Sequence, residues 1–310
     1  DVSSPNFNII SERVKSFTKL SFLKETKNRN IILTTVNGLL IKTAPIKFYS
    51  ENFLNITKQS KNSLKFISTF LSKIGYTRVE TVRESGEFAI RGSILDLFPV
   101  GSLNAFRIDF IGDEIDTMKF MDSLTQRSSD LVNNIDVYPS NEYLLDTKNI
   151  ENFRQKFRST FGSESLKSQI YENISSGMKF QGIEHFLPLI HQNALNSIFD
   201  FFNNDPKLIV VLSKNFSTVI NKRFEEIINF YDERKTEKSE NSVINMHDLY
   251  LSKKELDKKL VLFKTIELNE FDHLDNETKK NINLYSKPFL MPNDPNLPDN
   301  NKISTFIKFC

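Results

Sequence analysis

The clearest pattern in the chain is an alternation of apolar and polar residues between residues 75 and 128, which is the period of half-buried strands. In one run Phe106, Ile108 and Phe110 fall on one face, and Arg107, Asp109 and Ile111 fall on the other. Gly112 and Asp113 separate this run from the next, residues 115–120. A glycine-led pair between two such runs predicts a hairpin.

A second long strand is predicted over residues 88–98, and Gly92 in its middle predicts a bulge or a close backbone approach. Three or more strands with short links indicate a small antiparallel sheet. A helical pattern over residues 60–74 leads directly into these strands. We therefore expect one domain over residues 55–135.

Residues 1–54 read as helix, strand and helix. The first helix follows Ser4 and Pro5. The apolar, β-branched run 31–36 predicts a parallel strand that is buried on both faces, and a short helix is predicted over 37–41. These residues have the pattern of the later part of an α/β domain.

The region after residue 135 mixes both patterns. Helices are predicted up to Gly162, up to Gly177 and over 219–231, and apolar strands are predicted over 208–212 and 261–266. The fold class predicted for the chain is α/β and α+β multidomain. It comprises a partial parallel α/β domain (1–54), an inserted small antiparallel-sheet domain with helices (55–135), a second small α/β domain (136–265), and a linker with the start of a next domain (266–310).

Composition limits the function. Lys and Arg (41) nearly balance Asp and Glu (39), and a net charge of +2 gives no broad attraction to nucleic acid. The single cysteine, Cys310, provides no disulfide framework, which fits a reducing cytosol. The sequence shows neither a signal peptide nor a long apolar run. We expect a cytoplasmic chain without a membrane span, and one that is a segment of a longer protein.

Motifs of catalysis are not apparent. No glycine has the G-x-x-x-x-G-K-[ST] spacing of a phosphate loop, so ATP hydrolysis by this segment is not expected. The histidines, His185, His191, His247 and His273, lack the spacing of metal ligands and are interpreted as structural. We expect no catalytic residue, metal, nucleotide or other cofactor in this segment.

The candidate functional residues lie on the outer face of the predicted sheet. Arg107 and Ile111 share that face, and Arg91 on the neighbouring strand can join them. An exposed apolar residue beside arginines on a sheet face is typical of a protein-binding patch. The alternative is that Arg107 only pairs with Asp109 or Asp96, and that Ile111 packs on a local helix.

Several segments carry a family resemblance. The stretches GYTRVETVRESGEFAIRGSILDLFP, RIDFIGDEID and TQRS, in this order, resemble the N-terminal UvrB-homology module of bacterial transcription-repair coupling factors (Mfd). The likeness spans roughly residues 1–265. It implies that residues 55–135 are an inserted domain that binds the repair protein UvrA and recruits it to stalled RNA polymerase for nucleotide excision repair.

The resemblance also implies what lies elsewhere. In the family, the inserted domain docks against the far C-terminal domain of the intact protein, which hides this surface. ATP- and Mg-dependent translocation on DNA and contact with RNA polymerase belong to later domains. A fragment of a UvrB-type excinuclease subunit, engaged in loading on damaged DNA, is the nearest alternative; that family carries a phosphate loop and a Tyr-rich hairpin. A DNA-binding module and an ATPase are further alternatives.

Few family residues can be carried over. By resemblance, Arg91 in Ile-Arg-Gly and Arg107 in Arg-Ile-Asp-Phe match two arginines of the UvrA-binding surface. Ile111 stands where the family usually has an aromatic residue. It keeps an apolar contact but loses ring stacking on an arginine.

Overall fold

The computed structural model describes residues 4–23, 30–192, 194–202, 205, 207–236 and 242–268. By its internal contacts the chain divides into two units, 1–268 and 269–310. The second unit lies outside the described residues, and with it most of the segment predicted as a linker and the start of a next domain.

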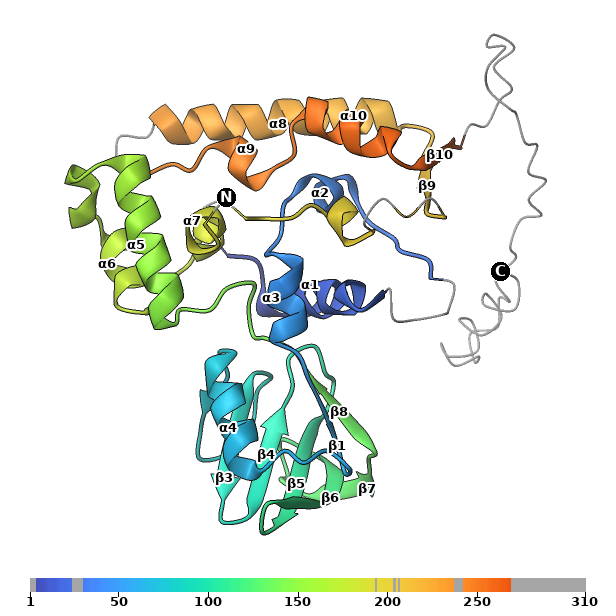
Figure 1. The fold of residues 1–310 in the computed structure, drawn as a ribbon, viewed down its shortest axis with the longest axis vertical. Coiled ribbons are helices and arrows are strands. Elements are labelled where there is room, and N and C mark those ends of the chain that lie inside the picture. Colours follow the sequence, from blue (N-terminus) through green and yellow to red (C-terminus); the bar gives the residue numbers. More distant parts are fainter. Residues whose placement is uncertain are drawn as a thin grey trace. The chain divides into compact units, whose positions relative to one another are not determined.

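Residues 77–131 form a six-stranded sheet with the order β2-β3-β4-β5-β6-β7 (Figure 1). Its strands are β2 Thr77–Arg78, β3 Glu87–Arg91, β4 Ile94–Phe98, β5 Ala105–Ile111, β6 Glu114–Met121 and β7 Ser128–Leu131. Neighbours are antiparallel except for the short β2, which runs parallel to β3. The predicted antiparallel sheet is thereby confirmed.

The single long strand predicted over residues 88–98 is wrong, because the chain reverses there. Strands β3 and β4 form a hairpin in which Arg91 pairs with Ile94, so Gly92 and Ser93 are a two-residue turn. Gly92 has φ +61°, and a glycine with positive φ at the first of two turn residues is the requirement of a type II′ turn. A turn this short leaves the apolar–polar alternation almost unbroken, so the pattern alone did not reveal the reversal.

The second hairpin was predicted correctly. Ile111 pairs with Glu114 across Gly112 and Asp113, and Gly112 also has φ +61°. Both hairpins therefore use the same glycine-first turn, and both turns lie at the same end of the sheet. The backbone N–H of Phe110 donates to the carbonyl of Ser93 at 2.9 Å and joins the two ends.

Helix α4 (Leu64–Lys73) packs on the inner face of the sheet. Its first turn is capped by Ser63, whose side chain accepts from the N–H of Phe66, and Gly75 follows its end with φ +93°. The core beneath it contains Ile67, Leu71, Ile74, Phe88, Leu95, Leu97, Phe106, Ile108 and Phe110. Helix 60–74 is thus confirmed, with a start at Leu64.

The chain enters and leaves this sheet region through one ribbon. Strands β1 (Leu54–Thr57) and β8 (Asn134–Val137) pair antiparallel, with Leu54 opposite Val137. Ile56, Ile135 and Val137 belong to the same core as α4. Residues 54–137 therefore build one continuous core of their own, inserted between an earlier and a later part of the chain.

The remaining elements are mostly helical (Figure 1). They are α1 Phe7–Ser21, α2 Val36–Leu40, α3 Ile46–Glu51, α5 Thr147–Phe161, α6 Gln169–Ser175, α7 Leu187–Ile190, α8 Phe216–Thr236, α9 Met246–Leu249, α10 Lys253–Val261, β9 Ile209–Leu212, β10 Lys264–Glu267 and 3-10 turns at Glu164–Lys167, Ile183–Phe186 and Ile198–Phe202. One core joins Val14 and Leu40 to Ile220 and Phe263, and another surrounds Phe153. The domain limits 1–54 and 136–265 stay a prediction.

The parallel strand predicted over 31–36 is wrong. Residues 30–35 form no ladder with a described residue, and Ile31 and Leu33 are exposed. Thr35 instead caps α2 by accepting from the N–H of Gly38. An apolar, β-branched run favours a strand only when a neighbour offers hydrogen bonds, and that information is not local.

The predictions for the region after residue 135 are confirmed in part. Strand β9 lies within the predicted run 208–212 and pairs parallel with β10, and Gly162 ends α5 with φ +79°. Helix α10 was missed, and the strand predicted over 261–266 begins only at Lys264. No helix in the described ranges is both long and apolar enough to cross a membrane.

Candidate functional site

The cross-strand register defines the outer face of the sheet. Asp96 on β4 lies between Ala89 on β3 and Arg107 on β5. Arg91 is two residues beyond Ala89 on β3, so it points to the same side. Arg91, Asp96 and Arg107 therefore meet on the face opposite α4.

Both arginines bind the same carboxylate. The Nε of Arg107 donates to Oδ1 of Asp96 at 2.7 Å, and its Nη2 donates to Oδ2 at 2.9 Å. The Nη2 of Arg91 donates to Oδ2 as well. The Asp96 side chain is 1% exposed, against 20% for Arg107 and 49% for Arg91. A buried carboxylate is thus covered by two guanidinium groups, one of them half open to solvent.

Arg107 has further acceptors in the loop before β7. Its Nη1 donates to the carbonyl of Gln126 at 3.3 Å and to Oγ of Ser128 at 3.5 Å. Its Nη2 also lies 3.3 Å from Sδ of Met121. The hydrogen bonds to Asp96 raise the pKa of Arg107 above its ordinary value, against the opposing effect of burial. The guanidinium of Arg107 is therefore held on every side.

The loop that receives Arg107 contains the segment TQRS. Gln126 adopts φ +61°, and its side-chain amide donates to the carbonyls of Val82 and Ser123. Asp122 accepts from the N–H groups of Leu124 and Thr125, and these bonds lower its pKa. Sequence reasoning found this segment only by resemblance; its contact with Arg107 needs the register of β6 and β7.

Lys119 is a charged residue of the outer face that the sequence analysis missed. It lies opposite Arg107, and its Nζ is 3.8 Å from Oδ2 of Asp109. A regular hairpin closed by Ile111 and Glu114 would place residue 118 there. One extra residue on β6, between the pairs Phe110–Ile115 and Asp109–Thr117, shifts the register by one.

Ile111 is 71% exposed at the turn end of β5. The other end of the outer face is covered, because Val82, Ala89, Ala105 and Met121 are buried there. The structure therefore places Arg107 and Ile111 on one face, as the period predicted, and Arg91 lies on this face with them. Of the alternative, the pairing of Arg107 with Asp96 is found, whereas Ile111 is not packed on a helix.

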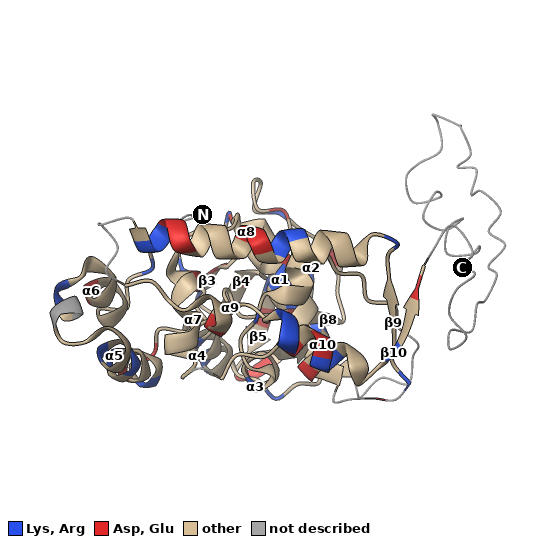
Figure 2. Ribbon diagram, turned by 90° about the horizontal axis from the view of Figure 1, so that it is seen from above, with Lys and Arg blue, Asp and Glu red and all other residues tan. Residues whose placement is uncertain are grey.

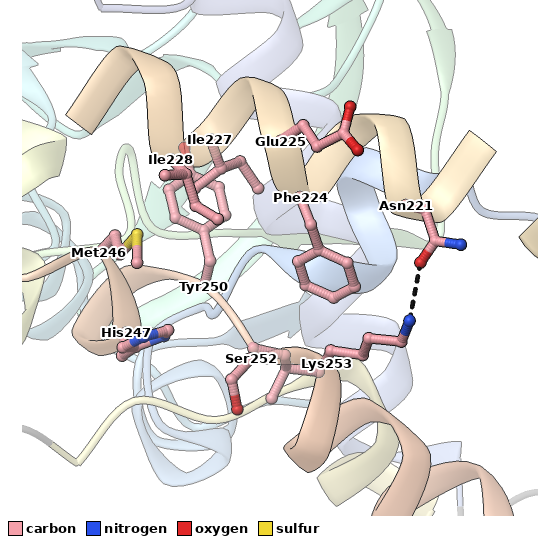
Figure 3. Close-up of a pocket in the computed structure, with 11 residues that line it drawn as sticks. Asn221, Phe224, Glu225, Ile227, Ile228, Met246, His247, Tyr250, Ser252 and Lys253 are labelled. Atoms are coloured by element: carbon pink, nitrogen blue, oxygen red, sulfur yellow. Dashed lines mark hydrogen bonds between the residues drawn. The ribbon is translucent and has the colours of Figure 1, made fainter. Parts of the chain in front are cut away.

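A pocket of about 490 Å³ lies elsewhere, between α8 and the segment from α9 to α10 (Figure 3). The rings of Phe224 and Tyr250 point into it, and Nζ of Lys253 donates to Oδ1 of Asn221 at 3.0 Å across one end. Basic and acidic residues are interspersed along α8 and α10 (Figure 2). The pocket contains none of the predicted site residues.

Comparison with known sequences gives the sheet region its class. The sequence profile described as the UvrB interaction domain matches residues 54–143. This range begins at the first residue of β1 and ends six residues after β8. The part of the chain that carries Arg91, Arg107 and Ile111 is therefore a domain of this class.

Whole-chain relatives identify the family. The chain is 31% identical over 289 residues to the transcription-repair-coupling factor of Haemophilus influenzae, covering 93% of this chain and 24% of that protein. It is 34% identical over 209 residues to the one from Escherichia coli, covering 67% of this chain and 18% of that protein. For Rickettsia bellii the identity is 32% over 235 residues, covering 76% of this chain and 20% of that protein. The chain belongs to the transcription-repair-coupling factor family and spans a quarter or less of the length of these relatives.

Proposed function

We propose that the outer face of the sheet binds UvrA, and that the chain thereby serves transcription-coupled nucleotide excision repair. As part of a longer coupling factor, it recruits UvrA to a stalled RNA polymerase. Family membership supports the role in repair. The choice of face rests on the geometry around Asp96.

The observation that carries this proposal is a buried carboxylate bound by two arginines, Arg91 (49% exposed) and Arg107 (20% exposed), with Ile111 exposed at the turn end of the same face. Guanidinium groups that are already oriented lose little freedom when they bind an acidic partner. An exposed aliphatic side chain beside them adds apolar area that a partner can cover. Arginine anchors of this kind dominate many protein interfaces.

We further propose that binding needs no cofactor from this segment. ATP and Mg, translocation on DNA and contact with RNA polymerase are assigned to other parts of the longer protein, whose C-terminal domain docks against the sheet region and hides this face. Capture of UvrA by the chain is then the same with and without added Mg-ATP, apart from effects that nucleotide has on UvrA itself.

The test measures UvrA binding to the full chain by biolayer interferometry. Arg91→Ala and Arg107→Ala are each expected to weaken binding by about tenfold or more. Arg158→Ala is the matched control, because it removes the same charge from an exposed position on α5. If both site variants bind as the wild type does, the site assignment is wrong; if the wild type does not bind, the function itself is wrong.

A further inference from the structure

The two arginines of the outer face differ in how many donors they have left. A guanidinium carries five N–H groups. For Arg107, Nε and Nη2 meet Asp96, Nη2 also faces Met121, and Nη1 meets Gln126 and Ser128. All five N–H groups of Arg107 are therefore directed at acceptors of its own chain.

Arg91 stands in contrast. Within the described part of the chain, its only side-chain hydrogen bond runs from Nη2 to Asp96. Its Nε and Nη1 donate to no described residue, and its side chain is 49% exposed. Most N–H groups of the Arg91 guanidinium are therefore available to a partner, while its one bond to Asp96 fixes the orientation of the guanidinium plane.

The charges on this face leave no surplus, because Glu114 lies opposite Ile111 and shares the face with it. Arg91, Arg107 and Lys119 carry three positive charges, and the carboxylates paired with them, Asp96 and Asp109, carry two negative ones. The carboxylate of Asp96 is buried, so a partner in solvent cannot reach it and its charge acts on the two arginines that cover it. What distinguishes Arg91 on this face is therefore its free donors and not a net positive charge.

We propose that Arg91 alone makes the ionic contact with the partner, and that Arg107 and Asp96 are positioning residues that act through Arg91. This inference rests on the proposed function. The group it fits is a carboxylate of an acidic side chain, which takes two parallel N–H bonds from the free donors of Arg91. Ile111, at the same end of the sheet, then meets an apolar neighbour of that carboxylate.

The positioning role has a physical basis. Asp96 holds Oδ2 toward Nη2 of Arg91 only while Arg107 fixes the carboxylate from the other side with two bonds. Without Arg107 the carboxylate is free to rotate toward Arg91 and to take over its remaining donors. Loss of Arg107 therefore weakens binding indirectly, because Asp96 then competes with the partner for Arg91.

A double-mutant cycle separates the two roles. UvrA affinity is measured for wild type, Arg91→Ala, Arg107→Ala and the double variant, each in the full chain. Each single variant is expected to weaken binding about tenfold or more. In the Arg91→Ala background, Arg107→Ala should change the dissociation constant by about twofold or less, since residues that act through one contact are not additive.

Two further variants guard against a merely structural effect. Arg107→Lys keeps a positive charge beside Asp96, and Asp96→Asn removes the competing charge from the Arg107→Ala protein. We expect Asp96→Asn to restore part of the binding lost by Arg107→Ala, a rescue that general loss of folding would not produce. Circular dichroism melting confirms that each variant is folded before its affinity is used.

The outcomes are distinct. If Arg107→Ala weakens binding by the same factor in the Arg91→Ala background as in wild type, Arg107 contacts the partner itself and this inference is wrong. If neither arginine matters while the wild type binds, both the inference and the choice of face are wrong. If the wild type does not bind UvrA, the proposed function fails independently of this inference.

Discussion

Two buried carboxylates, Asp96 and Glu142, show how similar chemistry serves different ends in two regions of the molecule. The Asp96 side chain is 1% exposed and the Glu142 side chain 9%, and each binds an arginine. Asp96 lies under two arginines on the outer face of a sheet. Glu142 lies five residues after β8, in the core that joins the earlier and the later parts of the chain.

The partners of Glu142 come from three other segments. Nε of Arg13 in α1 donates to Oε2 at 2.9 Å, and Oγ1 of Thr43 donates to Oε1 at 2.6 Å. The hydroxyl of Tyr49 in α3 donates to the same oxygen. The Arg13 guanidinium also lies 4.9 Å from the centre of the Phe17 ring.

This arrangement fixes the charge on Glu142. Burial by itself would raise the pKa of Glu142, but Arg13 and the hydroxyl donors outweigh it and the pKa is lowered. Burial raises the pKa of Tyr49 well above its ordinary value, so the phenol stays protonated and keeps donating. Arg13 also donates from Nη2 to the carbonyl of Lys42 at 3.3 Å, and its side chain is only 22% exposed.

The difference teaches that burial of a carboxylate does not by itself indicate a binding site. What distinguishes Asp96 is that one of its partners, Arg91, retains free donors in solvent. The arginine that binds Glu142, Arg13, is 22% exposed against 49% for Arg91, and the Glu142 carboxylate ties three segments together. We therefore interpret Glu142 as structural, and the predictions below test that contrast.

The largest expected effect is on stability, from Glu142→Ala. Removing the carboxylate leaves Arg13, Thr43 and Tyr49 without their shared acceptor. Breaking a buried ion pair in this way typically costs about 3–5 kcal/mol. Urea unfolding measures the loss, and Glu151→Ala, an exposed glutamate of α5, serves as control. A loss below about 1 kcal/mol would show that this cluster does not hold the segments together.

Arg107→Ala should destabilise the protein less, by about 1–3 kcal/mol, because Asp96 keeps its bond to Arg91. Adding Asp96→Asn removes the buried charge that this substitution leaves with one partner. We expect the double variant to be more stable than Arg107→Ala alone in the same urea experiment. Equal stability of the two would mean that the charge of Asp96 is not the source of the loss.

A third prediction uses pH to separate the two regions. Nε2 of His191 lies 2.7 Å from the backbone carbonyl of Glu142. A carbonyl only accepts, so Nε2 carries the proton and donates. Burial lowers the pKa of His191, although the nearby Glu142 opposes this effect. The folded protein therefore keeps the ring neutral where the unfolded chain, with an ordinary pKa of about 6.5, binds a proton.

The sign follows from linkage. Because the folded state binds fewer protons, the stability due to neutral His191 is complete above about pH 6.5 and is lost as pH falls toward the lowered pKa. Unfolding at pH 7.5 and pH 5.5 should show this loss in wild type and a smaller one in His191→Gln. Residues 54–137 contain no histidine, so variants of the outer face such as Arg91→Ala should keep the wild-type pH dependence. A wild-type stability that does not change over this range would contradict the assignment.

The sequence was informative where the relevant physics is local. Period two placed Arg107 and Ile111 on the outer face, because alternation within one strand needs no knowledge of its neighbours. The contact of Arg91 with Asp96 depends on the reversal at Gly92, which the pattern hid; the pairing of Arg107 with Asp96 was considered from the sequence, as one alternative. The Glu142 cluster joins segments up to 129 residues apart, and no local signal connects them.

Lys119 shows the same limit on a smaller scale. It faces outward opposite Arg107 only because β6 carries one extra residue between the pairs that involve Phe110 and Asp109. A bulge of this kind moves every later side chain to the other face. The sequence of β6 contains no signal that predicts the bulge, so Lys119 was not among the candidate residues of the outer face.

The smallest expected effect comes from Lys119→Ala. Its Nζ is 3.8 Å from Asp109, a long pair on partly exposed side chains, and such pairs contribute about 0–1 kcal/mol. We expect UvrA affinity to fall by less than about threefold, far less than for Arg91→Ala. The effect should shrink further in high salt, because it acts through screened charge rather than through oriented donors. A loss as large as that of Arg91→Ala would mean that the partner responds to the total charge of the outer face and not to hydrogen bonds from the guanidinium of Arg91.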